Sequence, residues 1–91
     1  MTEEQTSEQN VSLEEVQQLA KRFIELANEI KNQGRSPAAI NGALMFASAI
    51  YATYTAAGNE GYLHESGIDK VAGSYRRNLA KLQELKKAAK G

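Results

Sequence analysis

The chain has 91 residues, of which 42% are hydrophobic and 24% are charged, and its formal net charge is zero. This length fits one domain, and the apolar share is that of a folded protein rather than a disordered one. The absence of cysteine excludes disulfides, thiolate zinc sites and thiol nucleophiles, and it is compatible with a cytoplasmic location. A balanced charge gives no global attraction to nucleic acid or lipid. The acidic, polar first ten residues do not resemble a secretory signal, so we expect none.

Residues 1–11 are predicted to form a disordered tail, because Glu, Gln, Ser and Thr have little apolar surface to bury. Residues 12–90 are predicted to form a single domain of three helices. The first helix is expected at about residues 13–33, with Ser12 and Glu15 in a capping box at its start and Gly34 just past its end. Its apolar stripe recurs every three or four residues and consists of Val16, Leu19, Ala20, Phe23, Ala27 and Ile30.

The stretch from Ser36 to Asn59 contains no charged side chain. Ser36 as N-cap and Pro37 as first helical residue predict a second helix at about residues 37–57. A surface helix normally has a charged face, so a helix without one should be covered on more than one side. The stretch is long enough to cross a membrane, but its Ser, Thr, Asn, Tyr and Ala content predicts no membrane span.

At 100° per residue the second helix has four distinct sides. A stripe of larger side chains is the predicted contact with the other helices: Ile40, Leu44, Ala47, Tyr51 and Tyr54. A polar seam is predicted to meet water: Asn41, Ser48 and Thr55. The remaining two sides are small or apolar and are predicted to form a partner interface: Gly42, Met45, Phe46, Ala49, Ile50, Ala52 and Ala56.

A third helix is predicted at about residues 67–89, after a loop that contains Gly58 and Gly61. Asn78 falls within its apolar stripe, where it can fix the helix register or contact a ligand. Residues 67–91 carry two acids and seven bases, whereas residues 1–66 carry a net charge of −5. This basic helix is either a solvated face or a surface for nucleic acid or an acidic partner, with Arg76, Arg77 and Lys81 as its candidate residues. Nucleic acid is the less favoured partner, because no recognised binding motif accompanies the charge.

No constellation in the sequence supports catalysis. His64 is the only histidine, and it lies in a loop without the further ligands that a metal site needs. Nucleophilic catalysis also requires an oriented base beside a Ser or Thr, and the sequence offers no such pattern. We therefore predict no enzyme activity, no metal and no cofactor.

Two short runs carry a family resemblance: Arg22–Asn28, RFIELAN, and Ala43–Ala49, ALMFASA. They resemble an uncharacterised family of small all-helical bacterial proteins, whose members carry a similar FI-LAN start and LMYAA centre. The resemblance covers about residues 20–80 and leaves the Gln-rich start and the Lys-rich end outside. It implies a compact all-α protein of a bacterial cytoplasm and no particular activity. Asn28 is the polar residue shared with the motif, and a helix-cap or solvent role suits it as well as a site role.

Together these patterns predict an all-α, up-down-up three-helix bundle whose Ala/Gly-rich second helix lies at a homodimer interface. The leading hypothesis is a non-enzymatic interaction protein that self-associates, or that docks another protein's helix, through this second helix. One alternative is a bundle that binds a small ligand near Asn78, Tyr51 and Tyr54. The other is a weak binder of nucleic acid or an acidic partner through the basic third helix.

Overall fold

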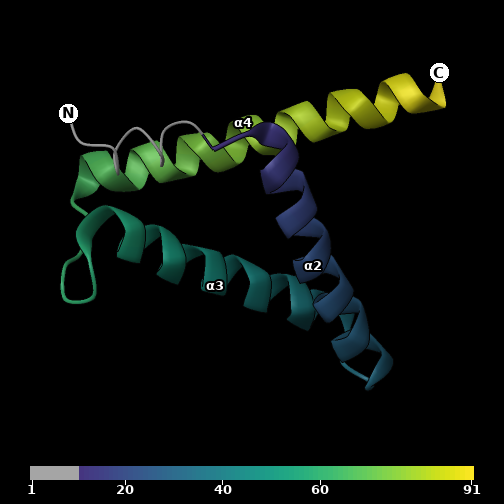
Figure 1. Cartoon of the computed structure of the whole chain (residues 1–91), viewed down its shortest axis with the longest axis horizontal. Coiled ribbons are helices and arrows are strands. Elements are labelled where there is room, and N and C mark those ends of the chain that lie inside the picture. The colour runs from purple at the N-terminus through teal and green to yellow at the C-terminus, as the bar shows by residue number, and fades with distance from the viewer. Residues whose placement is uncertain (1–10) are drawn as a thin grey trace. The chain divides into compact units, whose positions relative to one another are not determined.

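The computed structural model describes residues 11–91, which contain three α-helices and no strand. Helix α2 is Leu13–Asn32, α3 is Pro37–Ala57 and α4 is Glu65–Lys90 (Figure 1). The prediction of an all-α, three-helix fold is therefore confirmed. Helix α4 begins two residues before its predicted start at residue 67 and ends one residue beyond its predicted end at 89. The predicted disordered tail, residues 1–11, lies outside the described residues except for Val11.

The chain separates into two compact units, which meet within α3 between Leu44 and Met45. The up-down-up packing and the single-domain organisation stay predictions. The first unit contains α2 and the start of α3, and the second contains the rest of α3, a loop and α4. None of the described helices combines the length and the apolar content needed to cross a membrane.

In the first unit, local hydrogen bonds fix both ends of α2 and the start of α3. The Ser12 half of the predicted capping box is confirmed at the α2 N-terminus, because the Glu15 amide donates to Ser12 Oγ at 3.0 Å. At the other end Gly34 adopts a φ of +103°, which favours glycine, and its amide donates to the Lys31 carbonyl at 2.9 Å. The Ala39 amide then donates to Ser36 Oγ at 3.1 Å, which starts α3 at once.

The half-buried residues of the first unit lie around the turn between α2 and α3. Ala27 and Ile30 near the end of α2, and Ile40 in the first turn of α3, are half-buried. The other described residues of this unit are exposed, and Phe23, in the middle of the α2 apolar stripe, is 63% exposed. The first unit is thus a helical corner whose apolar contact is confined to the region around the turn.

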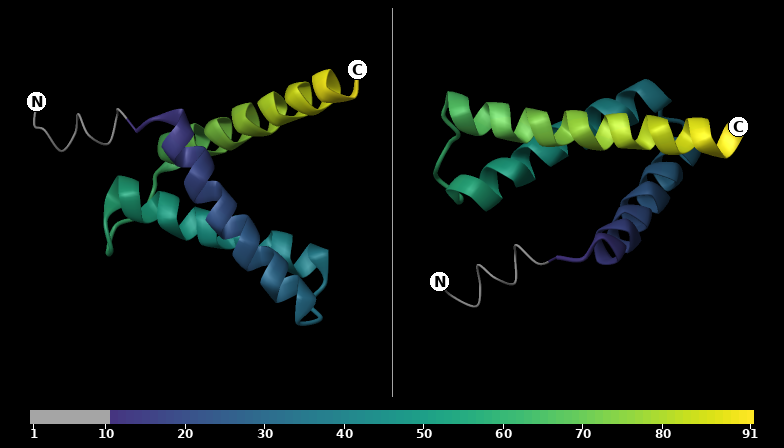
Figure 2. Two further views of the ribbon diagram at one scale, coloured as in Figure 1. Left: turned by 45° about the vertical axis from the view of Figure 1, so that its right-hand side comes forward. Right: turned by 90° about the horizontal axis from the view of Figure 1, so that it is seen from above.

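In the second unit the chain reverses direction through residues 58–64 and returns as α4 (Figures 1 and 2). Gly58 ends α3 with a φ of +81°, and its amide donates to the Tyr54 carbonyl at 2.8 Å. Glycines let the loop backbone pass close to its neighbours, because a Cβ at Gly61 would collide with the Ala57 carbonyl oxygen. A Cβ at Gly67 would lie 3.3 Å from Leu63 Cδ2. The half-buried residues of this unit cluster around the reversal: Ala52, Thr53, Ala57, Leu63, Gly67, Val71 and Gly73.

The stripe of larger side chains on the second helix was predicted to contact the other helices. This prediction is wrong at the C-terminal end of the stripe. Tyr51 and Tyr54 are 69% and 49% exposed, whereas the half-buried residues there are Ala52, Thr53 and Ala57. Small side chains allow the loop to approach the helix closely, whereas two tyrosine rings hold neighbouring backbone away. The Tyr51 and Tyr54 rings instead pack on each other, with their centroids 5.9 Å apart.

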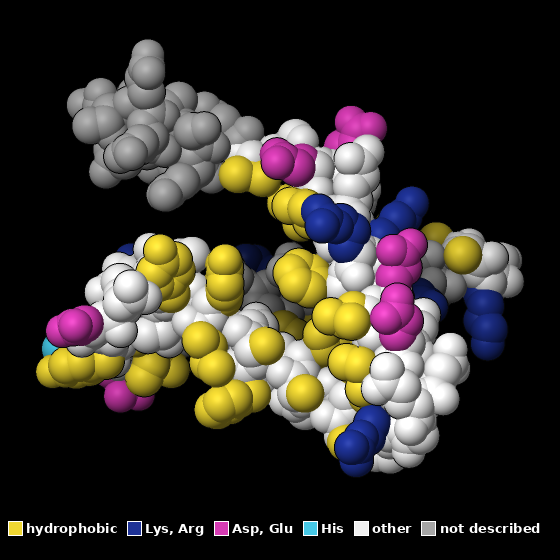
Figure 3. Space-filling view, turned by 60° about the horizontal axis from the view of Figure 1, so that its bottom comes forward, with side chains coloured by type: hydrophobic (Ala, Val, Ile, Leu, Met, Phe, Trp, Pro, Cys, Tyr) yellow, Lys and Arg dark blue, Asp and Glu magenta, His cyan; other side chains and the backbone are white. Residues whose placement is uncertain are grey.

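No residue within the described range 11–91 is fully buried. Large hydrophobic side chains on all three helices are more than one-third exposed, and many of them are visible in yellow in Figure 3. Folded proteins gain most of their stability by removing such side chains from water. The apolar surface of this chain therefore exceeds what its described residues cover.

Candidate functional site: an apolar groove on α3

One hollow in the second unit is a shallow groove along the C-terminal half of α3. It has a volume of about 370 Å³. Five helix residues and three loop residues line it: Phe46, Ala49, Ile50, Thr53, Tyr54, Gly58, Asn59 and Gly61. The five helix positions fall on one side of α3 at 100° per residue, and the loop after Gly58 closes the end of the groove.

The groove has a small floor and bulky walls. Ala49, Gly58 and Gly61 contribute little or no side chain, whereas Phe46, Ile50 and Tyr54 are 70%, 56% and 49% exposed. Such a surface can accept an apolar knob between its larger side chains. Nothing in its shape requires a small molecule.

The chemistry of the groove is that of apolar contact. The lining residues that the structure describes contain no carboxylate, imidazole, amine or guanidinium group. The Thr53 hydroxyl already donates to the Ala49 carbonyl at 2.8 Å, so its proton is engaged within the helix. The remaining polar groups are the Tyr54 hydroxyl and the Asn59 amide, and neither has an acid or base beside it in the groove.

The structure brings together three of the residues predicted for the partner interface, since Phe46, Ala49 and Ile50 all line the groove. Gly42, Met45 and Ala56 are exposed elsewhere on α3, and Ala52 is half-buried. A Cβ at Gly42 would meet nothing within 4 Å, so packing around this position does not require glycine there.

Sequence reasoning missed four lining residues, Thr53, Gly58, Asn59 and Gly61, and as a site residue it named Tyr54 only as a candidate ligand contact. The two glycines around Asn59 were visible as helix breakers directly after a charge-free helix. That signal could have indicated a loop folding back on α3.

The other predicted site residues lie on α4 and are exposed. Asn78 does not occupy a buried position, although the pattern placed it in the apolar stripe. Arg76, Arg77 and Lys81 are exposed, and Arg77 donates to Ser74 Oγ at 3.2 Å. His64 packs its ring 5.1 Å from that of Tyr62, and residues 11–91 contain no cluster of three or more potential metal ligands.

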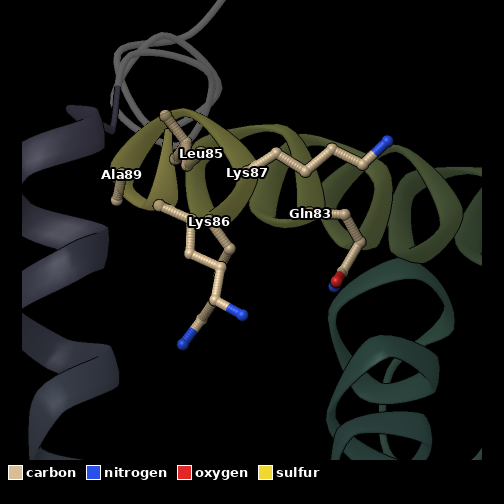
Figure 4. A pocket seen from close by; sticks show the side chains of 6 residues that line it. Gln83, Leu85, Lys86, Lys87 and Ala89 are labelled. Carbon is tan, nitrogen blue, oxygen red and sulfur yellow. The ribbon is translucent and has the colours of Figure 1, made fainter.

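A second hollow lies along the last turns of α4 (Figure 4). Its described lining comes from this one helix: Gln83, Leu85, Lys86, Lys87, Ala89 and Lys90. All of these described lining residues are exposed.

One comparison with known proteins identifies the family of this chain. The family described as "Protein of unknown function (DUF3144)" matches residues 16–81. The chain belongs to the DUF3144 family. The match includes every helix residue of the groove and the loop that completes it, and it stops before Leu82 in α4. Neither the curated proteins nor the solved structures contain a match to the chain.

Proposed function

We propose that this DUF3144 chain is a non-enzymatic interaction protein of a bacterial cytoplasm that forms a homodimer through α3. The observation that carries the proposal is the groove. Its wall residues Phe46 and Ile50 are 70% and 56% exposed, and they lie on a helix without charged side chains. Exposed apolar patches that are contiguous usually mark a binding surface.

The exposed side chains of the groove walls supply about 60% of the area that a small specific interface requires. An aromatic side chain can bury about 200 Å², so Phe46 and Tyr54, at 70% and 49% exposure, offer about 240 Å². Ile50, at 56% exposure, adds about 50 Å² on the scale of an aliphatic side chain. Two copies then contribute about 600 Å² from three side chains each, compared with about 1,000 Å² in total for a specific interface. The small residues of the groove floor and the neighbouring Met45 can supply the remainder.

A second copy of the chain is the favoured occupant because the groove is electrically neutral. No charged side chain lies on α3, so two copies of this surface meet without repulsion. A two-fold axis near Ala49 lets the Phe46 ring of each copy enter the groove of the other, and two-fold dimers are the commonest oligomers. A helix from a different protein would fit the same groove, and it is the competing occupant.

The experiment introduces one negative charge on either of two sides of α3. Ile50→Glu places a carboxylate in the groove wall, whereas Ser48→Glu places one on the polar seam, about 160° away around the helix. We expect Ile50→Glu to give a monomer by analytical ultracentrifugation and Ser48→Glu to keep the dimer mass. Circular dichroism checks that both variants keep their helix content. A wild-type chain that is monomeric at high micromolar concentration excludes the homodimer.

A further inference from the structure

The second half of α4 concentrates the positive charge of the chain. Residues 75–90, called here the basic segment, contain six bases and one acid, so their net charge is +5. The rest of the chain carries −5, which is why the total is zero. The bases are Arg76, Arg77, Lys81, Lys86, Lys87 and Lys90, and all of them are exposed.

The same segment also carries an apolar stripe. Tyr75, Leu79, Leu82 and Leu85 follow one another at intervals of four, three and three residues, so they share one side of the helix within about 120°. Their exposed fractions are 50%, 45%, 46% and 54%, respectively. Asn78 and Lys86 also fall on this side and Lys90 borders it, whereas Arg76, Arg77, Lys81 and Lys87 lie outside it. The basic segment thus combines an exposed apolar stripe with basic residues that flank it and, at Lys86, interrupt it near the C-terminal end; long Lys side chains can extend from such a position to the headgroups.

We propose that the basic segment binds flat on an anionic lipid surface. An interfacial helix buries an apolar stripe at the level of the headgroups while its Lys and Arg side chains pair with anionic lipids. The stripe and the net charge of +5 meet both requirements, and α4 is not apolar enough to cross the bilayer instead. This surface is separate from the α3 groove, and the inference does not depend on the proposed homodimer.

The apolar stripe favours a lipid surface over a nucleic acid. Phosphates of DNA or RNA would pair with the basic residues but would leave Leu79, Leu82 and Leu85 in water. Binding to single strands usually adds several stacked aromatic rings, and this segment has only Tyr75. An acidic protein would need a groove shaped to the stripe, whereas a fluid interface accepts any exposed amphipathic helix.

The test is sedimentation of the full chain with vesicles of phosphatidylcholine alone and with one-third phosphatidylglycerol. We expect binding to the anionic vesicles only, and loss of binding at about 1 M salt, where the Debye length is about 3 Å. The triple variant Lys86→Gln/Lys87→Gln/Lys90→Gln should bind about 100-fold more weakly, at about fivefold for each charge. Leu82→Ser should reduce binding about tenfold by removing part of the stripe.

The matched control removes the same net charge outside α4, as Lys21→Gln/Lys31→Gln/Arg35→Gln, and it should leave vesicle binding nearly unchanged. Circular dichroism verifies the helix content of each variant. The triple variant on α4 still decides the question if Leu82→Ser loses helix. Absence of vesicle binding, equal binding to neutral vesicles, or equal losses in both triple variants would overturn the proposal. Binding to a single-stranded RNA oligonucleotide that exceeds vesicle binding and does not change in Leu82→Ser would assign the segment to nucleic acid instead.

Discussion

Replacing Phe46 by alanine tests the proposed homodimer most directly. The side chain is 70% exposed, so about 140 Å² of a typical aromatic area of about 200 Å² remains available to a partner. Alanine would remove about 100 Å² of this, which corresponds to about 2.5 kcal/mol for each copy at about 25 cal/mol per Å². A two-fold dimer loses the contribution twice, so complete burial of both rings predicts a loss of about 5 kcal/mol.

The expected increase in the dissociation constant depends on how completely the two Phe46 rings are buried in the dimer. Complete burial of both rings corresponds to about 4,000-fold weaker association, and half burial to about 60-fold, because about 1.4 kcal/mol is a factor of ten. Sedimentation equilibrium over a wide range of concentration measures the constant. Urea unfolding at a concentration where the chain is monomeric should change little, because Phe46 has few contacts to lose within its own chain.

Tyr51→Ala is the matched control for this experiment. Tyr51 is 69% exposed, almost the same as Phe46, but it lies about 140° away around α3. It does not line the groove. Its ring packs on Tyr54, so we expect its truncation to weaken the dimer far less than truncation of Phe46 does, without abolishing it. If the two truncations weaken association equally, the groove is not the interface, and if both leave it unchanged the homodimer does not use this part of α3.

The three remaining predictions concern the stability of the chain and are measured by urea unfolding at low protein concentration. Gly61→Ala should destabilise by about 1–3 kcal/mol, because the new Cβ collides with the Ala57 carbonyl and the loop must shift. Gly42→Ala should stabilise by about 0.5–1 kcal/mol, because the new Cβ meets open space and alanine favours helix; a loss of stability there would contradict the open environment. Ser12→Ala should cost about 1 kcal/mol and reduce the helix signal of α2, because the Glu15 amide loses its acceptor; an unchanged circular dichroism spectrum would refute this role of the cap.

The helix boundaries were the most predictable part of the structure because they depend on local hydrogen bonds. Ser12 and Ser36 accept the amide hydrogen bonds that a capping side chain is expected to accept, and Gly34 and Gly58 adopt positive φ values at helix ends. The predicted start of α4 is two residues late, because such a local signal is missing there. His64 precedes α4 without a side-chain cap, so no local signal marked the boundary.

The groove was predictable in part. The side of α3 that carries Phe46 and Ile50 was found from its angular position and from the absence of charge. The end of the groove depends on the path of the chain after Gly58, which brings Gly61 against Ala57. Hydrophobic patterning assigns the packed side to the bulkiest residues, whereas this reversal required the smallest ones. That is the physical reason why Tyr51 and Tyr54 were assigned to the wrong side.

The two proposed surfaces differ in charge, and this difference separates them experimentally. The described lining residues of the α3 groove are all uncharged, so burial of Phe46 and Ile50 should be insensitive to screening by salt. The basic segment of α4 carries +5, so its attraction to anionic lipid should fall steeply as the Debye length shortens. One titration with sodium chloride can therefore test both surfaces on the same chain. Retention of the dimer mass together with loss of vesicle binding supports two independent surfaces. Joint loss of both would place the charged residues of α4 within the self-association contact.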